Sequence, residues 1–480
     1  MIYPLATRGK FMKIALLRAT TALAFASLAS CGGDSGGGSP TPPPVVNSPP
    51  VIGSGNAEVS VAENSSGNVF VVTASDANGD ALTYSLTGAD ASSFAITASG
   101  AVTFVESPNF DLPTDSNRDN LYEFAINVSD GKSSATAQAK VTVQNEKEGV
   151  AVTRLTRFED TGLVASTIDR SAGLLVVRSN GQLLNIDSAS GTIEAVGNAF
   201  LNGESGRVLA AYQDRIWIFT VLEVEGIGIV VRFNSARYAF SSRPTVLLTN
   251  RTGSNAKASF VINSGFLGVA VGDPDGSAAQ ESSQGSGKLF KLNFDPYCGA
   301  SLDTVCLTGD MIGDGIHAPT GGGAVETLAF LVDRGTDQQD EVTSFDPTVR
   351  PLDFGWPYRE GTYVRVANPP EVINGPFLTF ERGEDFGRSQ GLVGGALYTG
   401  SITSLADRLL LGDTSGRIFA VPRSFATDGV LHTGVEAEDR TLDFTPDDGA
   451  IDEVRQILTL WDGTIIIVDA DGEVFRVSGG

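Results

Sequence analysis

The chain is poor in the residues that most often carry catalysis or bind transition metals. Its 480 residues include only two histidines, His317 and His432, and three cysteines. Structural zinc sites use clusters of cysteine and histidine, so these numbers argue against one. Positive charge is scarce as well: 33 lysines and arginines stand against 57 aspartates and glutamates, a net charge of −24. A chain with this charge repels phosphate backbones, which argues against a nucleic-acid partner.

The apolar segment near the N-terminus is too short to span a bilayer as a mature helix. It reads TALAFASLAS (residues 21–30) and follows Lys13 and Arg18. That order is typical of a secretory signal, so we expect an exported chain. Residues 28–31, Leu-Ala-Ser-Cys, resemble the lipobox of bacterial lipoproteins. The resemblance implies that residues 1–31 are signal and lipobox, and that an acylated Cys31 anchors the chain to the outer membrane or the periplasmic face. An ordinary signal peptide cut nearby is the alternative.

Two cysteines remain once Cys31 is set aside. Cys298 and Cys306 lie in YCGASLDTVCL (residues 297–307), a short polar segment. In an oxidising compartment they can close this loop as a disulfide. Two free thiols are the alternative that the sequence leaves open.

A tether and then a β-sandwich are expected in the first third of the chain. Residues 32–50 read GGDSGGGSPTPPPVVNSPP, in which glycine and serine give flexibility and proline stiffens the chain, so no core forms there. From residue 51 to 148, short segments such as FVVTASD and YEFAINVSD alternate apolar and polar residues between Asn, Gly and Asp. About seven short strands in such a segment predict an immunoglobulin-like sandwich.

The acidic residues of this segment fall at the ends of the expected strands. The pieces AEN, DANGD, NFDLPTDSNRDNLYEF and VSDG follow in an order that resembles bacterial cadherin-like repeats. The resemblance implies a calcium site, since gathered carboxylates repel one another until a cation joins them. Its ligands would be Glu63, Asp76, Asp115, Asp119 and Asp130. The alternative is that these carboxylates only form turns.

The remaining residues, 150–480, show no helical periodicity and contain a recurring unit instead. SNGQLLNID (179–187), GSGKLFKLNFD (285–295), TSGRIFAVP (414–422) and ADGEVFRVS (470–478) each join a glycine turn to an alternating strand. Such repeats predict propeller blades, and the segment has room for six blades of roughly 50 residues. We therefore expect an all-β chain: an immunoglobulin/cadherin-like β-sandwich followed by a six-bladed β-propeller. Two stacked sandwiches are the alternative to the propeller.

Several propeller segments resemble the soluble quinoprotein sugar dehydrogenases of the glucose/sorbosone type. These are LVDRGTDQQDEV (331–342), PLDFGWPYREGTY (351–363) and SQGLVGGALYTGSITSLADRLLLGDTSGRIFAVP (389–422). The resemblance implies a central channel that holds pyrroloquinoline quinone (PQQ) and calcium, where an imidazole accepts a sugar proton while hydride passes to the quinone. The cation would polarise the quinone carbonyl, and arginines would hold the carboxylates of the cofactor.

The chain departs from that pattern at the reacting groups. The position of the catalytic histidine is Ser254, whose hydroxyl is far too weak a base to replace an imidazole, so no catalytic residue is assigned. The residues that the resemblance places beside the cofactor are His317 (at an arginine position), Gly335, Thr336 and Trp356. The alternatives are that His317 is a core or surface histidine and that Trp356 is a structural plug between blades. The carboxylates that would bind calcium in the same loop are Asp340 and Glu341.

Three functions follow from these patterns. The first is an exported, lipid-anchored, calcium-binding protein whose two domains bind carbohydrate or a surface protein, with the catalytic base lost. The second is a periplasmic PQQ-dependent aldose dehydrogenase that oxidises sugars to lactones. The third is another propeller chemistry, such as lactone hydrolysis. The loss of imidazole at position 254 favours the first.

Overall fold

A computed structural model describes residues 46–53, 56–167, 173–214, 217–235, 245–249, 257–263, 265–276, 286–295, 306–369, 371 and 374–480. The predicted lipidation site Cys31, the base position Ser254 and Cys298 lie outside these residues. Cys306 begins a strand, but its side chain is also outside the description, so the disulfide stays a prediction. None of the helices within these ranges has the length and apolar character that a membrane crossing requires.

The first domain is a β-sandwich, as the period-two alternation predicts. One sheet has the order β2 (Ala57–Ala62), β9 (Ser134–Gln144), β8 (Leu121–Ser129), β5 (Thr83–Thr87). The other has the order β3 (Asn68–Val71), β7 (Ala101–Phe104), β6 (Phe94–Ile96), and β1 (Val51–Ile52) pairs with β4 (Ala74–Ser75). Along β8 and β9, buried residues alternate with more exposed ones, because successive side chains point to opposite faces. The short helix η1 (Ala91–Ser93) precedes β6.

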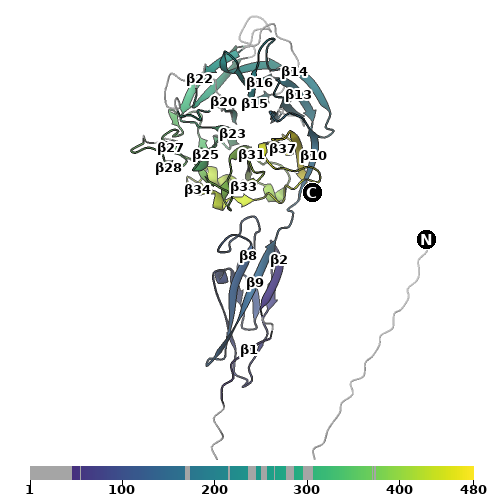
Figure 1. Cartoon of the computed structure of the whole chain (residues 1–480), viewed down its shortest axis with the longest axis vertical. Helices are drawn as coiled ribbons and strands as arrows, with labels where there is room; N and C mark the ends of the chain where they lie inside the picture. Colours follow the sequence, from purple (N-terminus) through teal and green to yellow (C-terminus); the bar gives the residue numbers. More distant parts are fainter. Residues whose placement is uncertain are drawn as a thin grey trace, which may run out of the picture. The chain divides into compact units, whose positions relative to one another are not determined.

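Six sheets, each built around four strands, form the blades of the second domain, which is a six-bladed propeller (Figure 1). The first three blades are β11 (Val164–Thr167), β12 (Gly173–Val177), β13 (Gln182–Asp187), β14 (Ile193–Asn198); β15 (Gly206–Asp214), β16 (Trp217–Val224), β17 (Gly228–Ser235), β18 (Thr245–Thr249); and β19 (Ala258–Asn263), β20 (Phe266–Val271), β21 (Lys288–Asp295), β22 (Cys306–Asp314). The next two are β23 (Pro319–Val325), β24 (Leu328–Asp333), β25 (Gln339–Phe345), β29 (Leu378–Arg382); and β31 (Leu392–Leu397), β32 (Arg408–Asp413), β33 (Ile418–Pro422), β35 (Glu438–Asp439).

The sixth blade closes the ring with strands from both ends of the domain. It contains β36 (Val454–Thr459), β37 (Ile465–Asp469) and β38 (Glu473–Gly479), and its outer strand is β10 (Val150–Arg157). Because β10 comes first in the domain and pairs with the last strand from Val150↔Gly479 onward, the first and last segments hold each other in place. A closed ring also leaves few exposed sheet edges.

Short elements decorate the blades. They are β26 (Leu352–Asp353), β30 (Arg388–Ser389) and β34 (His432–Thr433) at sheet edges, the hairpin β27 (Arg359–Glu360) and β28 (Tyr363–Val364), and the short helices η2 (Thr403–Leu405), η3 (Arg423–Ala426) and η4 (Gly434–Glu436). The segment with FGWP contributes β26 and the hairpin.

The recurring unit of the sequence is the turn between the second and third strands of a blade. Its glycines, Gly181, Gly287, Gly416 and Gly472, all have φ between 71° and 96°. An L side chain is strained in that region, so glycine is the residue that allows the tight turn. The sequence pattern thus marked four of the six blades correctly.

Candidate functional site

The first strand of each blade lines an axial channel. These strands, β11, β15, β19, β23, β31 and β36, contact one another in a closed ring. All six contribute residues to a cavity of about 480 Å³, which we call the inner cavity. A second cavity of about 330 Å³, the outer cavity, is lined largely by the beginnings of the same strands and shares Ala210, Ser259, Thr320 and Gln456 with the first. The two cavities therefore adjoin along the axis.

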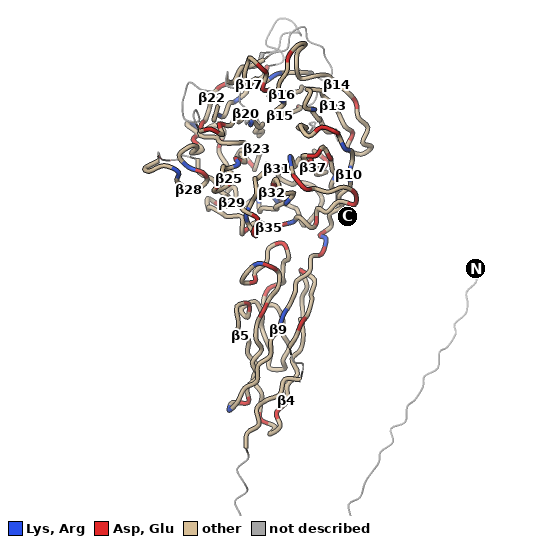
Figure 2. The backbone as a smooth tube through the Cα atoms, in the orientation of Figure 1, with Lys and Arg blue, Asp and Glu red and all other residues tan. Residues whose placement is uncertain are grey.

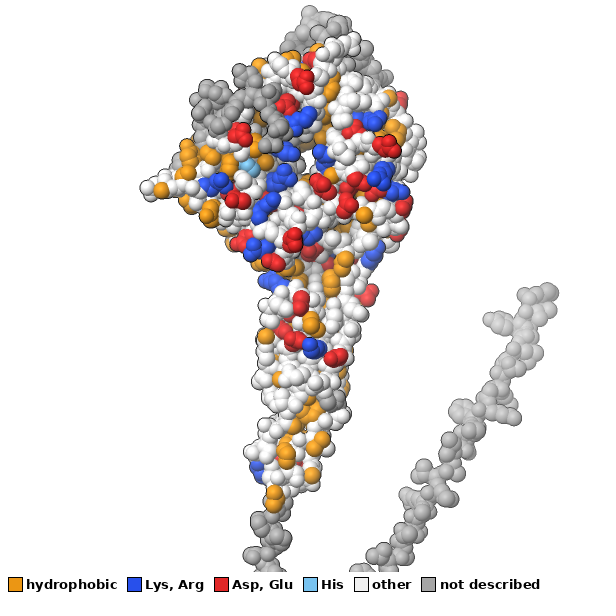
Figure 3. Space-filling view, viewed as in Figure 1, with side chains coloured by type: hydrophobic (Ala, Val, Ile, Leu, Met, Phe, Trp, Pro, Cys, Tyr) orange, Lys and Arg blue, Asp and Glu red, His pale blue; other side chains and the backbone are white. Residues whose placement is uncertain are grey.

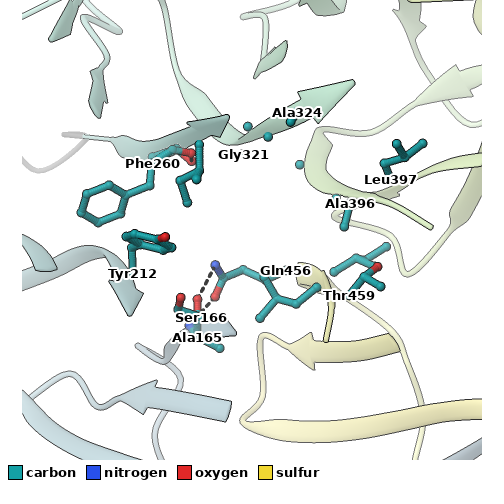
Figure 4. A pocket seen from close by; sticks show the side chains of 18 of the residues that line it. Ala165, Ser166, Tyr212, Phe260, Gly321, Ala324, Ala396, Leu397, Gln456 and Thr459 are labelled. Carbon is teal, nitrogen blue, oxygen red and sulfur yellow. Dashed lines mark hydrogen bonds between the residues drawn. The ribbon is translucent and has the colours of Figure 1, made fainter. Parts of the chain in front are cut away.

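The inner cavity is wide because its walls are built from small residues. Gly321–Gly323, Gly394, Gly395 and several alanines face it (Figure 4). A Cβ placed on Gly394 would lie 2.1 Å from the Cα of Gly321, so the strands β23 and β31 approach more closely than side chains would permit. Aromatic and polar side chains complete the lining: Tyr212, Phe260, Trp461, Ser166, Gln456 and Thr459.

Gln456 ties the first and last blades together across the channel wall. Its side-chain oxygen accepts a hydrogen bond from the Ala165 backbone N–H, and its Nε2 donates to the Ala165 carbonyl at 3.1 Å (Figure 4). The side-chain amide thus imitates a strand pairing. This fixes a polar group where the two cavities meet.

The outer cavity is basic, although the chain is strongly acidic. Arg207, Lys257, Arg334 and Arg455 line it, and Glu453 is the one acidic residue of its described lining. Figure 3 shows basic side chains around the hollow at the centre of the propeller face. Acidic residues, by contrast, are spread through both domains (Figure 2). The outer cavity therefore gathers four basic side chains in a lining that has one described acidic residue.

These cations repel one another. Burial lowers the pKa of Lys257, and the positive charges of Arg334, Arg455 and Arg207 lower it further. The Glu453 carboxylate acts in the opposite direction and raises it. Burial also lowers the pKa of Arg455, while the charges of Glu453 and Asp160 act in the opposite direction. Arg207 is neutralised by Glu223, to which its Nε donates at 2.8 Å. Within the described ranges, no carboxylate forms an ion pair with the other three cations, so an anion in the cavity would be attracted.

His317 faces neither cavity. The side chain is 8% exposed, its Nδ1 contacts the Arg334 carbonyl, and its Nε2 lies 3.3 Å from the Thr336 hydroxyl. Its ring packs on Trp356 with 4.2 Å between centroids. The Trp356 indole in turn donates to the Asp273 carbonyl at 2.8 Å and lies under Arg365. This geometry suits packing between blades, and cofactor contact by His317 and Trp356 stays a prediction.

The predicted calcium loop is held by protein groups. Asp340 is fully buried, and its oxygens accept from the Gly335 N–H at 2.9 Å, the Leu392 N–H at 2.8 Å and Arg382 at 3.0 and 3.1 Å. Glu360 accepts from three consecutive backbone N–H groups, those of residues 337–339. Arg382 therefore already supplies the positive charge that Asp340 requires.

Glu341 differs from Asp340, since no cation is paired with it in the described structure. Burial raises its pKa well above the usual range, and Asp333, opposite it on β24, raises it further. Burial likewise raises the pKa of Asp333 to about 6. Neither residue lines the channel cavities. Calcium at Gly335, Thr336, Asp340 and Glu341 stays a prediction.

The predicted calcium ligands of the sandwich all accept backbone hydrogen bonds: the four aspartates from residues two to five positions later, and Glu63 from segments distant in the sequence. Asp76 accepts from Asn78 and Asp80, and Asp130 from Lys132 and Ser133. Asp115 accepts from residues 119 and 120, and Asp119 from residue 121. Glu63 accepts from the N–H groups of Phe110 and Glu146 at 2.9 Å. The structure does not gather these five carboxylates into one cluster, and calcium binding by them stays a prediction.

The one clustered acidic group among the described residues was missed by the sequence reasoning. Asp111, Glu148 and Asp443 place carboxylate oxygens within 4.8 Å of one another. Arg440, 1% exposed, lies among them, with Nε 2.9 Å from Asp111 and Nη2 2.9 Å from Glu148 and 2.5 Å from Asp443. Burial raises the pKa of Asp111 to about 8, although Arg440 acts against this. The guanidinium already occupies this cluster as its counter-ion.

Comparisons with known proteins identify the first domain and the fold of the second. The family of bacterial Ig domains matches residues 47–144. These residues form a bacterial Ig-like domain. No curated protein matches the chain. A solved glucose dehydrogenase matches with a TM-score of 0.51 at 17% identity, covering 69% of this chain and all of that one. At this identity the match shows the propeller fold alone.

Two further solved structures are more distant. The apo soluble aldose sugar dehydrogenase of Escherichia coli matches with a TM-score of 0.48 at 17% identity, over 69% of this chain and all of that one. Human protocadherin-24 EC1-2 matches with a TM-score of 0.22 at 16% identity, over 42% of this chain and 93% of that one. The cadherin-like character of the Ig-like domain therefore stays a prediction.

Proposed function

We propose that this chain is an exported binding protein whose propeller takes a small acidic ligand, a sugar acid, at its axis. The observation that carries the proposal is the group of four cationic side chains around the outer cavity in a chain of net charge −24. Three of them lack an ion pair within the described ranges, so a bound carboxylate would gain attraction without displacing a protein anion.

The inner cavity supports a sugar as the rest of the ligand. Ser166, Gln456 and Thr459 place neutral polar groups along its lining, and Tyr212 and Trp461 place aromatic rings there. Sugar rings present hydroxyl edges and C–H faces, which such a mixed lining can contact. A carboxylate at the basic end and hydroxyls toward Gln456 would use both cavities.

Calorimetry with glucuronate and glucose tests this proposal, because the two sugars differ only in the carboxylate. We expect glucuronate to bind at least about tenfold more tightly, with an affinity that falls as salt rises. Arg334→Gln and Arg455→Gln should each weaken the binding of glucuronate but not the binding of glucose. Arg157→Gln is the matched control, because Arg157 is exposed and pairs with Asp471 away from the channel. Equal binding of both sugars, or binding of neither, would contradict the proposal.

A PQQ-dependent aldose dehydrogenase is the second candidate, favoured by the same cations, which fit the carboxylates of that cofactor. When bound, the quinone would supply hydride acceptance. The described lining of both cavities contains no imidazole or carboxylate base other than Glu453. We therefore expect no dye reduction with glucose after reconstitution with PQQ and calcium. Turnover under these conditions would establish the dehydrogenase instead.

Lipid anchoring at Cys31 and calcium binding by the Ig-like domain complete the proposal. A bacterial Ig domain supports a location outside the cytoplasm, as the predicted signal does. Cys31→Ala should release the protein from membranes if the lipobox is used. The heat of calcium binding can be measured by calorimetry for an Asp76→Ala, Asp119→Ala double variant. If this heat is unchanged from that of the original chain, these carboxylates only form turns.

A further inference from the structure

Lys257 is the single lysine among the described residues that line the two channel cavities. It immediately precedes the inner strand β19, so the backbone of a blade holds its Cα at the channel wall. The residue is exposed to solvent although many protein atoms surround it, which is the situation of a side chain inside an open cavity. A ligand in the outer cavity can therefore reach its amine.

Three other lysines of the described residues pair with carboxylates. Lys132 lies 2.8 Å from Asp80 and Lys140 lies 2.5 Å from Glu123, and hydrogen bonds to these partners raise the pKa of both lysines. Lys288 is buried against Asp314. Lys257 has arginines as its charged neighbours, with Glu453 as the opposing charge. An amine in such surroundings is more easily deprotonated and thus more nucleophilic.

We propose that Lys257 forms an imine with a small anionic aldehyde or ketone that the arginines of the outer cavity hold by its carboxylate. This inference rests on the proposed function, because it uses the same basic cavity, and it adds the carbonyl as the second feature of the ligand. The open-chain form of a sugar acid has both groups.

The chemistry balances with the groups present. The neutral Nζ attacks the carbonyl carbon, and proton transfer from nitrogen to oxygen gives a carbinolamine. Loss of one water, which carries away the carbonyl oxygen and the two nitrogen protons, leaves the C=N bond. No electrons are transferred, so the step needs no oxidant or reductant, and hydrolysis reverses it. Arg334 and Arg455 attract the carboxylate and raise the local concentration of the carbonyl.

Three small probes separate the contributions: glyoxylate has a carboxylate and a carbonyl, acetaldehyde has the carbonyl alone, and glycolate has the carboxylate alone. The full chain is incubated with each probe and cyanoborohydride at neutral pH, and peptides are mapped by mass spectrometry. Reduction of the imine adds the mass of the probe less one oxygen atom. We expect glyoxylate to label Lys257 about tenfold faster than Lys132 or Lys140, and about tenfold faster than acetaldehyde labels Lys257. Glycolate should slow this labelling by competition.

Two variants complete the test. Lys257→Arg keeps the positive charge but cannot form an imine, so the adduct at this position should disappear. Arg334→Gln should reduce glyoxylate labelling of Lys257 to the rate seen with acetaldehyde. Labelling of Lys257 no faster than that of Lys132 overturns the inference, as does a glyoxylate rate that Arg334→Gln leaves unchanged. If glucuronate binds while Lys257 stays unlabelled, the imine is wrong and the binding function stands. If Lys257 is labelled but glucuronate fails to bind, the assigned ligand is wrong and the reactive amine stands.

Discussion

The close approach of β23 and β31 at Gly321 and Gly394 makes a measurable prediction for Gly394→Ala. The new Cβ would lie 2.1 Å from the Gly321 Cα and 2.6 Å from its nitrogen, and both are backbone atoms that cannot rotate away. Overpacking typically costs about 1–3 kcal/mol, and a backbone clash inside a closed ring belongs at the upper end. Replacing glycine also stabilises by about 0.4–1 kcal/mol through the unfolded chain. The free energy of unfolding should therefore fall by about 2 kcal/mol.

Tryptophan fluorescence measures this loss in the propeller alone, because Trp217, Trp356 and Trp461 all lie there. A loss of this size corresponds to a fall of about 3 °C in the thermal midpoint of a domain this large. Gly375→Ala is the matched control, since a Cβ at Gly375 meets no heavy atom within 4 Å. The double variant Gly321→Ala, Gly394→Ala should cost less than the sum of the single changes, because the first methyl group already separates the strands. Equal midpoints for Gly394→Ala and Gly375→Ala would refute the reasoning.

Three further predictions concern the buried charges. Arg440→Met should lower the free energy of unfolding in urea by about 3–5 kcal/mol, because it leaves buried carboxylates without their counter-ion. A change under about 1 kcal/mol would contradict this role of Arg440. The pKa of Asp111 is about 8 in the folded chain and 3.8 in the unfolded chain, so the unfolded chain loses this proton first and the free energy of unfolding should fall as pH rises from about 4 to 8. Asp111→Asn should flatten this fall. An unchanged slope in the variant would argue against a raised pKa for Asp111. Burial lowers the pKa of His432, but hydrogen bonds to Glu436 and Asp428 outweigh burial and raise this pKa overall. His432→Gln should therefore reduce the free energy of unfolding more at pH 6 than at pH 9. Equal losses at the two pH values would exclude a charged imidazole.

Much of the fold was readable from short patterns in the chain. Period-two alternation around residues 121–144 predicted the long strands β8 and β9, and a glycine turn before an alternating strand marked four blades. These are local rules: a strand buries every second side chain, and a turn with positive φ requires glycine. The closing role of β10 was not predicted, because its partner β38 lies over 300 residues away in the sequence.

The candidate site, unlike the fold, was not predicted from patterns in the sequence. The resemblance directed attention to His317, Asp340 and Glu341, yet the described structure buries these beside Trp356, Arg382 and Asp333 rather than in the channel. Lys257 lies three residues after the base position Ser254, but the sequence patterns assigned no role to it or to Arg455. No spacing rule relates Arg207, Lys257, Arg334 and Arg455, since each comes from a different blade.

The sequence by itself determined the two kinds of β-domain, because alternation and turn residues act on neighbours along the chain. Only the tertiary structure decided where charge collects. Ring closure brings the beginnings of six distant strands to one axis, and there four cations of a strongly acidic chain meet around a cavity. The physical reason is that pairing and turning are local, whereas the electrostatic potential of a cavity sums over every group that folding places near it.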